Sequence, residues 1–258
     1  MNLNYIFLLC LVASQSVAQN NSVISLKSKA NFPIGSSIRF VPFMKDIKLK
    51  GLQQHHFDSY TAGSDMKMYQ IALRPGVFRW DRVDSIVAYT QKNEQRLFGH
   101  TLIWHSATPK WIEKKAEKDP EWLDDFMKNY IQTYVKRYKG MVHGWDVVNE
   151  GLNTKGSGFR TESIWYKTMG ESYIEKAFRY AHEADPNAVL FYNDFNIERD
   201  SLKFNTRIKR VEAFKRRNEP IAGIGFQMHI HMDIPKEIIE YTIKRAADTG
   251  LQNNLSTV

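Results

Sequence analysis

The sequence predicts an α/β fold and, within that class, a (β/α)8 barrel whose last βα unit is missing. Three observations lead to this prediction. Short β-rich runs alternate with helical patterns, polar and reactive side chains stand at the downstream ends of at least four runs, and no Gly-rich nucleotide-binding loop follows a strand. The alternation is typical of parallel sheets. A doubly wound sheet is the alternative, but without a G-x-G-x-x-G or Walker motif the barrel is favoured.

Composition places the chain among globular proteins with one large domain. The 258 residues are 43% hydrophobic, and Lys plus Arg exceed Asp plus Glu by 36 − 28 = 8. No nucleic-acid motif or basic arm accompanies this excess, so we interpret it as a solvated surface. No charge-free apolar run reaches the roughly 20 residues that a membrane span needs. We therefore expect a monomer without a nucleic-acid partner, a membrane span or a cofactor.

Residues 1–18 have the character of a secretory signal peptide. They contain no Asp, Glu, Lys or Arg, and the small residues Ser16 and Ala18 stand three and one before a cut after Ala18. We expect secretion and a mature domain over 19–258. Cys10, the only cysteine, then leaves with the peptide, which excludes disulfides and thiolate chemistry in the mature chain. An N-terminal core segment is the alternative interpretation.

Seven β-rich runs are predicted to form the strands, with a helix in each gap between the last five. The runs are short and rich in β-branched and aromatic residues, as strands buried in a parallel sheet are. They cover Pro33–Arg39, Ser59–Met68, Arg96–His105, Val142–Glu150, Val189–Asn196, Gly223–His231 and Leu251–Val258.

Three helices can be argued from their end signals and apolar faces. In the first, Asp119 is a candidate cap before Pro120, aromatic residues follow at every fourth position from 122 to 138, and Gly140 ends the helix. The second ends at Asp185. The third begins after Pro235 and ends at Gly250. The expected buried faces are Trp122, Phe126, Tyr130, Tyr134 and Tyr138; Tyr173, Ile174, Ala177, Phe178 and Ala181; and Ile239, Ile243, Ala246 and Ala247.

Glu150 is the candidate proton donor, because it closes the fourth predicted strand at the end where barrels place catalysis. Asn149 beside it can hydrogen-bond a sugar hydroxyl or the neighbouring carboxylate. A salt-bridged or helix-capping glutamate is an equally good interpretation of Glu150 taken alone. The fifth predicted strand ends in amides that could hold a carboxylate or merely shape a loop.

Two further strand ends carry residues suited to a sugar site. On the third, His100 and Trp104 offer directional hydrogen bonds and a flat apolar face for a pyranose. On the sixth, Gln227 and His229 share a face and suit hydroxyl recognition. His229 and His231 also form an H-x-H pair that could hold a metal, but the other strand ends lack typical ligands, so we expect no metal site.

Four motifs together resemble the family 10 glycoside hydrolases, the endo-1,4-β-xylanases. Each alone is moderately specific, but all four occur in the family's order and spacing, and the likeness covers about Phe32 to Gly250. The motifs are Gly99-His100-Thr101-Leu102-Ile103-Trp104-His105-Ser106 with Thr108-Pro109-Lys110-Trp111, then Trp145-Asp146-Val147-Val148-Asn149-Glu150, Tyr192-Asn193-Asp194-Phe195-Asn196, and Gly223-Ile224-Gly225-Phe226-Gln227-Met228-His229.

The resemblance implies a barrel that hydrolyses xylan or xylo-oligosaccharides with retention of configuration. It implies that Glu150 is the acid/base and that Asn149 binds the sugar 2-hydroxyl at the cleavage subsite. It also implies that Lys67 contacts the sugar one position further out. The other residues implied to line the cleavage subsite are His100, Trp104, Gln227 and His229.

The chain departs from the family pattern at two places. On the second strand, Gly63 and Ser64 stand where the family has a Glu and an Asn that hold the distal sugar. On the seventh strand, Thr257 stands where the family has its nucleophilic Glu, and the last βα unit does not follow. A retaining glycosidase needs two carboxylates. We therefore expect a secreted xylanase relative with doubtful activity; the alternatives are a non-catalytic xylan-binding barrel and an inactive remnant.

Overall fold

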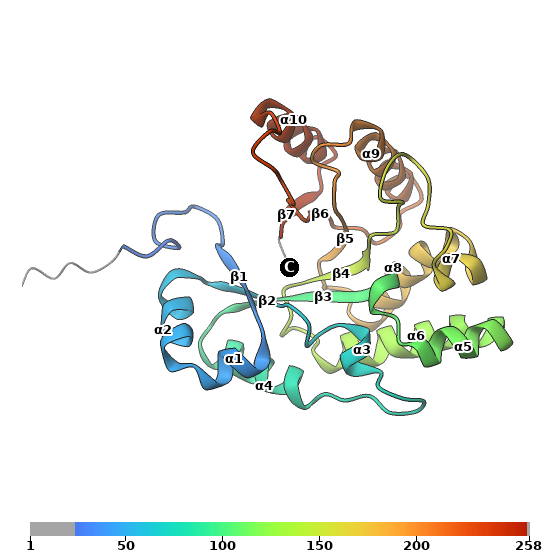
Figure 1. Cartoon of the computed structure of the whole chain (residues 1–258), viewed down its shortest axis with the longest axis horizontal. Helices are drawn as coiled ribbons and strands as arrows, with labels where there is room; N and C mark the ends of the chain where they lie inside the picture. Colours follow the sequence, from blue (N-terminus) through green and yellow to red (C-terminus); the bar gives the residue numbers. More distant parts are fainter. Residues whose placement is uncertain (1–23, 257–258) are drawn as a thin grey trace, which may run out of the picture.

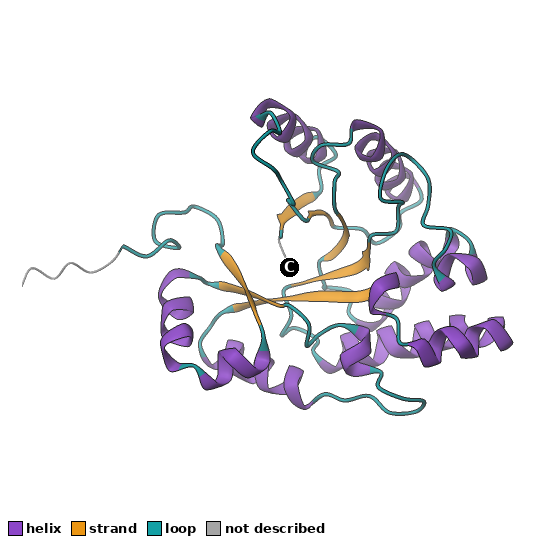
Figure 2. Ribbon diagram, in the orientation of Figure 1, coloured by secondary structure: helices purple, strands orange, loops and turns teal. Residues whose placement is uncertain are grey.

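The computed structural model describes residues 24–256 and shows one sheet of seven strands in the order β1 to β7. Every neighbouring pair is parallel. The sheet curls into a half-barrel with helices on its outer side (Figures 1 and 2). The predicted α/β class and the seven parallel strands are therefore confirmed. The predicted signal peptide, Cys10 and Thr257 lie outside the described residues.

The elements follow one another in a regular strand–helix rhythm. They are β1 (Gly35–Ile38), α1 (Phe40–Lys45), α2 (Ile47–His56), β2 (Ser59–Ala62), α3 (Met68–Ile71), α4 (Asp81–Lys92), β3 (Arg96–Trp104), the 3-10 turn His105–Ala107, α5 (Lys110–Lys118), α6 (Pro120–Arg137), β4 (Gly144–Asn149), α7 (Ile164–Met169), α8 (Ser172–Ala184), β5 (Leu190–Asp194), α9 (Ser201–Arg216), β6 (Gly223–Phe226), α10 (Lys236–Ala247) and β7 (Gln252–Leu255).

Each predicted strand is present, but all seven are shorter than the runs that predicted them. The second run extends to Met68, whereas β2 ends at Ala62. The sixth run extends to His231, whereas β6 ends at Phe226. The reason is that β-rich composition continues past the last ladder hydrogen bond into the loops. Part of the candidate site, including Glu150 and Gln227, lies in these loops, whereas Trp104 and Asn149 are the last residues of their strands.

The three argued helices also form, and α8 ends as predicted, whereas α6 ends at Arg137 and α10 at Ala247, each a few residues before the glycine predicted to end it. The Asp119 side chain accepts a hydrogen bond from the Trp122 amide, and Pro120 is the first residue of α6. Asp185 caps the end of α8, and Pro235 precedes α10. The predicted face of α10 is partly wrong, because Ala247 is exposed and Thr242 is buried in its place.

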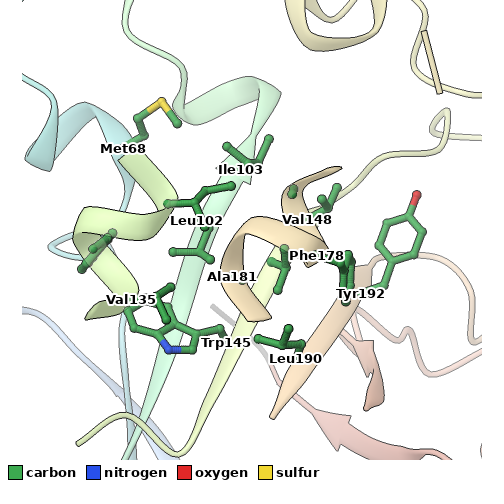
Figure 3. Packing of buried hydrophobic residues seen from close by; sticks show 14 of the residues in the cluster. Met68, Leu102, Ile103, Val135, Trp145, Val148, Phe178, Ala181, Leu190 and Tyr192 are labelled. Atoms are coloured by element: carbon green, nitrogen blue, oxygen red, sulfur yellow. The ribbon is translucent and has the colours of Figure 1, made fainter. Parts of the chain in front are cut away.

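The core lies between the sheet and the helices outside it. Figure 3 shows residues of α6 and α8 meeting those of β3, β4 and β5, with Trp145 packed beside Val135. The predicted aromatic stripe of α6 continues this core, because Tyr134 packs edge-on against Trp145 with ring centroids 5.0 Å apart. Each such buried side chain contributes about 1.5–3 kcal/mol. This packing fixes the central strands, whose ends carry the candidate site.

The half-barrel is open on one side. Within residues 24–256, β1 pairs only with β2, and β7 pairs only with β6. The strands run parallel, so their carboxyl ends meet at one rim. In the same described part of the chain, no helix is both long and apolar enough to cross a membrane.

Candidate active site

The candidate site is built on the carboxyl ends of four adjacent strands. In the sheet register, Asn149 at the end of β4 lies opposite Trp104 on β3 and opposite Asn193 on β5. Asn193 in turn lies opposite Gly225 on β6. A parallel barrel thus brings together residues that are far apart in sequence.

An amide network surrounds the carboxylate of Glu150. The side chain of Gln227 donates to Glu150 Oε1 at 3.0 Å and to Asn149 Oδ1 at 3.0 Å. Asn149 Nδ2 also donates to Glu150 Oε1 at 3.3 Å. His229 Nε2 lies 2.9 Å from Gln227 Oε1. The structure therefore brings four of the sequence-predicted residues into one hydrogen-bonded group. Within the described residues these bonds reach only Oε1, which leaves Oε2 for a substrate.

Asn193 belongs to this network, whereas the sequence predicted only that amides at the end of the fifth strand hold a carboxylate or shape a loop. Its fully buried side chain donates to Asn149 Oδ1 at 2.9 Å. A Cβ atom on Gly225 would collide with the Asn193 side chain, so a glycine at this register position makes room for the amide. The amide-rich end of the fifth predicted strand was the signal, but only the register shows which amide faces Asn149.

The backbone of Glu150 adopts the left-handed conformation, with φ of 57°. Non-glycine residues pay for this conformation with strain, and it persists only where surrounding contacts hold it. Here the Glu150 amide donates to Asn193 O at 3.0 Å, and Arg160 Nε donates to Glu150 O at 3.1 Å. Arg160 is only 8% exposed and comes from the loop after β4. Nothing in the sequence pattern singled it out.

A buried histidine–aspartate pair stands behind the rim. His100 Nδ1 lies 2.8 Å from Asp146 Oδ2, and both side chains are buried. Burial raises the pKa of Asp146, while the hydrogen bond with His100 opposes the rise. The predicted His100 is thus held by a carboxylate from the neighbouring strand, which orients its ring toward Trp104, 6.2 Å away between ring centroids.

Trp104 and Lys67 form a second group of predicted residues next to the first. The Lys67 ammonium lies 4.9 Å from the centroid of the Trp104 ring. Burial lowers the pKa of Lys67, and the charge of Glu150 opposes this effect. Trp104 Nε1 is buried without a hydrogen-bond partner in the described part of the chain. A buried donor of this kind is suited to a sugar hydroxyl.

His229 and His231 do not act as a pair. His229 contacts Gln227, and His231 is exposed further along the loop after β6. No group of three or more His, Cys, Asp or Glu side chains within residues 24–256 has the arrangement of a metal site.

The residues at this rim can transfer a proton through the positioned carboxylate of Glu150, and the Trp104 ring adds an apolar face to the same rim. Retaining glycosidases add a second carboxylate about 5–5.5 Å from the first. All described hydrogen bonds to the Glu150 carboxylate come from amides, and β7, the last described strand, contains no acidic residue. The predicted nucleophile position, Thr257, falls outside residues 24–256.

The sequence matches the model of glycosyl hydrolase family 10 over residues 24–257. It is 40% identical over 229 residues to endo-1,4-β-xylanase A of Caldicellulosiruptor sp., which covers 84% of this chain and 33% of that protein. It is 37% identical over 238 residues to β-1,4-xylanase of Dictyoglomus thermophilum, covering 91% of this chain and 66% of that protein. The chain thus spans a third to about two thirds of these two relatives.

Solved structures agree with the sequence matches. Native xylanase 10B from Thermotoga maritima superimposes with a TM-score of 0.85 at 34% identity, over 91% of this chain and 74% of that one. A variant of xylanase 10C from Cellvibrio japonicus, solved in complex with xylopentaose, gives a TM-score of 0.86 at 31% identity, over 92% of this chain and 50% of that one.

Proposed function

The chain belongs to glycosyl hydrolase family 10, and from this premise we propose that it acts on the xylan main chain with Glu150 as acid/base. The observation that carries the proposal is the amide network at the ends of β4, β5 and β6. Amides from three strands converge on Asn149 and Glu150, and the network leaves one carboxylate oxygen uncommitted. A structural glutamate would instead pair with a cation, and the Glu150 carboxylate has no such bond among the described residues.

The Trp104 ring supports xylan as the substrate. The Trp104 ring and its unpartnered Nε1 provide one apolar face and one donor, which are the two features that a pyranose requires. Lys67 and His100 flank the ring with further donors. The names of the relatives also point to β-1,4-linked xylan, and one was solved with xylopentaose.

In the proposed retaining mechanism, the described residues carry out the acid/base steps. Glu150 protonates the leaving oxygen and later takes a proton from water, while Asn149 binds the 2-hydroxyl. The attacking carboxylate of a retaining glycosidase belongs on the seventh strand, where this sequence has Thr257 at the aligned position. Proton donation alone is typically worth 10²–10⁴-fold. We therefore expect the 258-residue chain to hydrolyse xylan several orders of magnitude more slowly than xylanase 10B of Thermotoga maritima.

Secretion is part of the same proposal. A polymeric substrate lies outside the cell, and the charge-free start of the sequence with Ala18 before the expected cut supports export. Export of the chain from an expressing cell, with mass spectrometry showing a mature end at Gln19, is the expected result. Retention of residues 1–18 in the secreted product contradicts it.

The test of the activity combines hydrolysis with binding. Reducing-sugar release from soluble xylan is measured for the chain and for Glu150→Gln, with retention on insoluble xylan as the second readout. We expect weak hydrolysis that disappears in the variant, and binding that both proteins share. Equal hydrolysis by the two proteins removes Glu150 from the mechanism.

Two outcomes of this experiment identify the alternative functions. Retention on xylan that Trp104→Ala abolishes, without any hydrolysis, identifies a non-catalytic binding barrel. Absence of both readouts identifies an inactive remnant and contradicts the proposed function.

A further inference from the structure

A cavity outside the candidate active site lies between helices α9 and α10, which stand side by side in Figure 1. It has a volume of about 350 Å³, and small-molecule sites in proteins are typically about 300–1,000 Å³ in size. Its lining residues come from the first two turns of both helices and from the loop before α9. None of them belongs to the amide network around Glu150.

The apolar part of the cavity combines buried side chains with an exposed aromatic ring. Phe204 of α9 and Thr242 of α10 line it from below and are only 1% and 3% exposed. Ile238 and Tyr241 are three residues apart on α10, so they share one face of the helix. Tyr241 is 61% exposed, and no ring or cation of the described residues stacks on it. Its phenol ring is therefore available to a ligand.

Polar side chains surround this apolar part and have no partners of their own. Ser201 and Asn205 share a face of α9, and Glu237 lines the cavity from α10. Within residues 24–256, the side chains of these three residues form no hydrogen bond or ion pair. Arg199 uses only Nε, which donates to Asn196 Oδ1 at 3.0 Å. The cavity thus offers free hydroxyl, amide, carboxylate and guanidinium groups.

Two other surface cavities lack this combination of free groups. In the cavity between α8 and α9, Arg210 already pairs with Glu171 at 3.0 Å. In the cavity beside α5 and α6, the Trp122 ring is covered by the Lys115 ammonium, 4.3 Å from its centroid, and by the Phe126 ring at 4.9 Å. In both cases the protein itself occupies groups that a ligand would need.

The charges in the cavity between α9 and α10 favour a neutral ligand that is rich in hydroxyl groups. A carboxylate accepts hydrogen bonds from hydroxyls, a guanidinium donates to them, and an amide does both. Because Arg199 and Glu237 carry opposite charges, one of the two opposes any ionic ligand. A neutral sugar can bond to both, and its C–H face packs against an aromatic ring.

The cavity lies on the same side of the molecule as the candidate active site. The helices α9 and α10 follow β5 and β6, so both begin near the rim where the parallel strands end. The ends of these strands also position Asn193 and Gln227 of the amide network. A polysaccharide is the kind of ligand that can bind at two places on one side of a protein.

We propose that the cavity between α9 and α10 is a second carbohydrate site, which binds a short neutral segment of β-1,4-xylan and does not cleave it. Tyr241 stacks on a pyranose ring, while Glu237, Asn205 and Arg199 bind its hydroxyls. The choice of xylan rests on the proposed function, whereas the preference for a neutral sugar follows from the cavity itself. Binding at two sites strengthens the retention of a polymer without any new contact at the cleavage site.

The test is a titration of the 258-residue chain with xylohexaose, followed by 1H–15N NMR. The amide resonances of residues 201–205 and 237–242 report on the second site, and those of residues 149, 150 and 227 report on the active site. We expect both groups of resonances to shift. Tyr241→Ala is expected to weaken binding at the second site roughly tenfold, because stacking and apolar contact are lost. Tyr241→Phe keeps the ring and is expected to bind within about twofold of the unaltered chain.

Two further variants separate the polar contacts from general effects on the helices. Glu237→Ala removes an acceptor for hydroxyls and is expected to weaken binding at the second site roughly fivefold. Leu202→Ala is the matched control, because Leu202 is 56% exposed on α9 but does not line the cavity. It is expected to bind like the unaltered chain. Thermal unfolding of all variants checks that α9 and α10 still form.

Three results overturn the proposal: no shifts at residues 201–205 and 237–242, equal affinity of Tyr241→Ala and the unaltered chain at these residues, or the same loss in Leu202→Ala as in Tyr241→Ala. A Trp104→Ala variant separates this proposal from the proposed function. Shifts at the second site that persist in this variant, in a chain that shows neither active-site shifts nor xylan hydrolysis before the substitution, support the second site and contradict the proposed function. Shifts confined to residues 149, 150 and 227 do the reverse.

Discussion

The strands β4 and β7 have the same direction in the same sheet, yet they differ in almost every physical property. All six residues of β4 are buried, and its end carries Asn149 and Glu150 in a hydrogen-bond network with amides of neighbouring strands. None of the four residues of β7 is buried. The difference is the number of neighbours. A strand paired on both sides gains burial and positional precision that an edge strand lacks.

The largest expected effect comes from removing a buried carboxylate from β5, a strand that is paired on both sides. Asp194 at the end of β5 is fully buried and pairs with Lys203 at 2.8 Å and with Arg207. Asp194→Ala leaves both cations buried without a carboxylate, so we expect a loss of about 3–5 kcal/mol in the free energy of unfolding, measured in urea. Glu212→Ala, which breaks a partly exposed pair with Arg245 between α9 and α10, is the control and is expected to change little. A similar loss in both variants contradicts the comparison.

The second test applies one substitution to both regions. Leu97 on β3 is fully buried, whereas Leu255 on β7 is 53% exposed. Leu97→Ala is expected to cost about 2–5 kcal/mol, because it removes buried methyl groups and leaves a cavity. Leu255→Ala is expected to stay within about 0.5 kcal/mol. Chemical denaturation of the two variants under identical conditions compares their losses in the free energy of unfolding. Equal losses contradict the exposure of Leu255.

The third test uses alkaline pH on the central strand β5. Burial raises the pKa of Tyr192 to about 12. A phenol with a raised folded-state pKa stabilises fully below its ordinary value of 10, and this contribution is lost as pH rises from 10 to 12. The loss amounts to about 2.7 kcal/mol. Tyr192→Phe is expected to unfold less steeply with pH across this range; identical pH profiles for the two proteins refute the assignment.

The smallest expected effect concerns the contacts that position the Glu150 carboxylate. Arg160→Met removes the donor to Glu150 O and is expected to cost about 2 kcal/mol, since that hydrogen bond involves a charged group. The left-handed backbone of Glu150 is then held by Asn193 alone. We therefore expect the 13C resonance of the Glu150 carboxyl to shift, while the same measurement on an Arg245→Met control shows no shift. An unmoved resonance in Arg160→Met means that Arg160 is not needed to position Glu150.

Much of the fold was predictable because its signals are local. Pro120 after Asp119 defines the start of α6, and a period of four in the aromatic residues defines its buried face. The strands were found from β-rich runs, but their ends were placed too late. Composition does not indicate where a neighbour stops supplying hydrogen bonds, as the loop from Gln227 onward shows.

The sequence predicted most residues of the site but not the hydrogen bonds that join them. Motif resemblance selected Glu150, Asn149 and Gln227, and the structure joins them through hydrogen bonds. Arg160 was not singled out, and Asn193 was not distinguished from the neighbouring amides, because their contacts depend on a loop return and on strand register.

The sequence by itself determined the class of fold, the strand–helix order and the family, because hydrophobic period, helix end signals and motif spacing are written along the chain. Only the tertiary structure decided which side chains meet at the rim, which atoms lack partners and which edges stay open. Those properties depend on pairing between distant segments. Register and burial exist only after the sheet has curled, so no local pattern contains them.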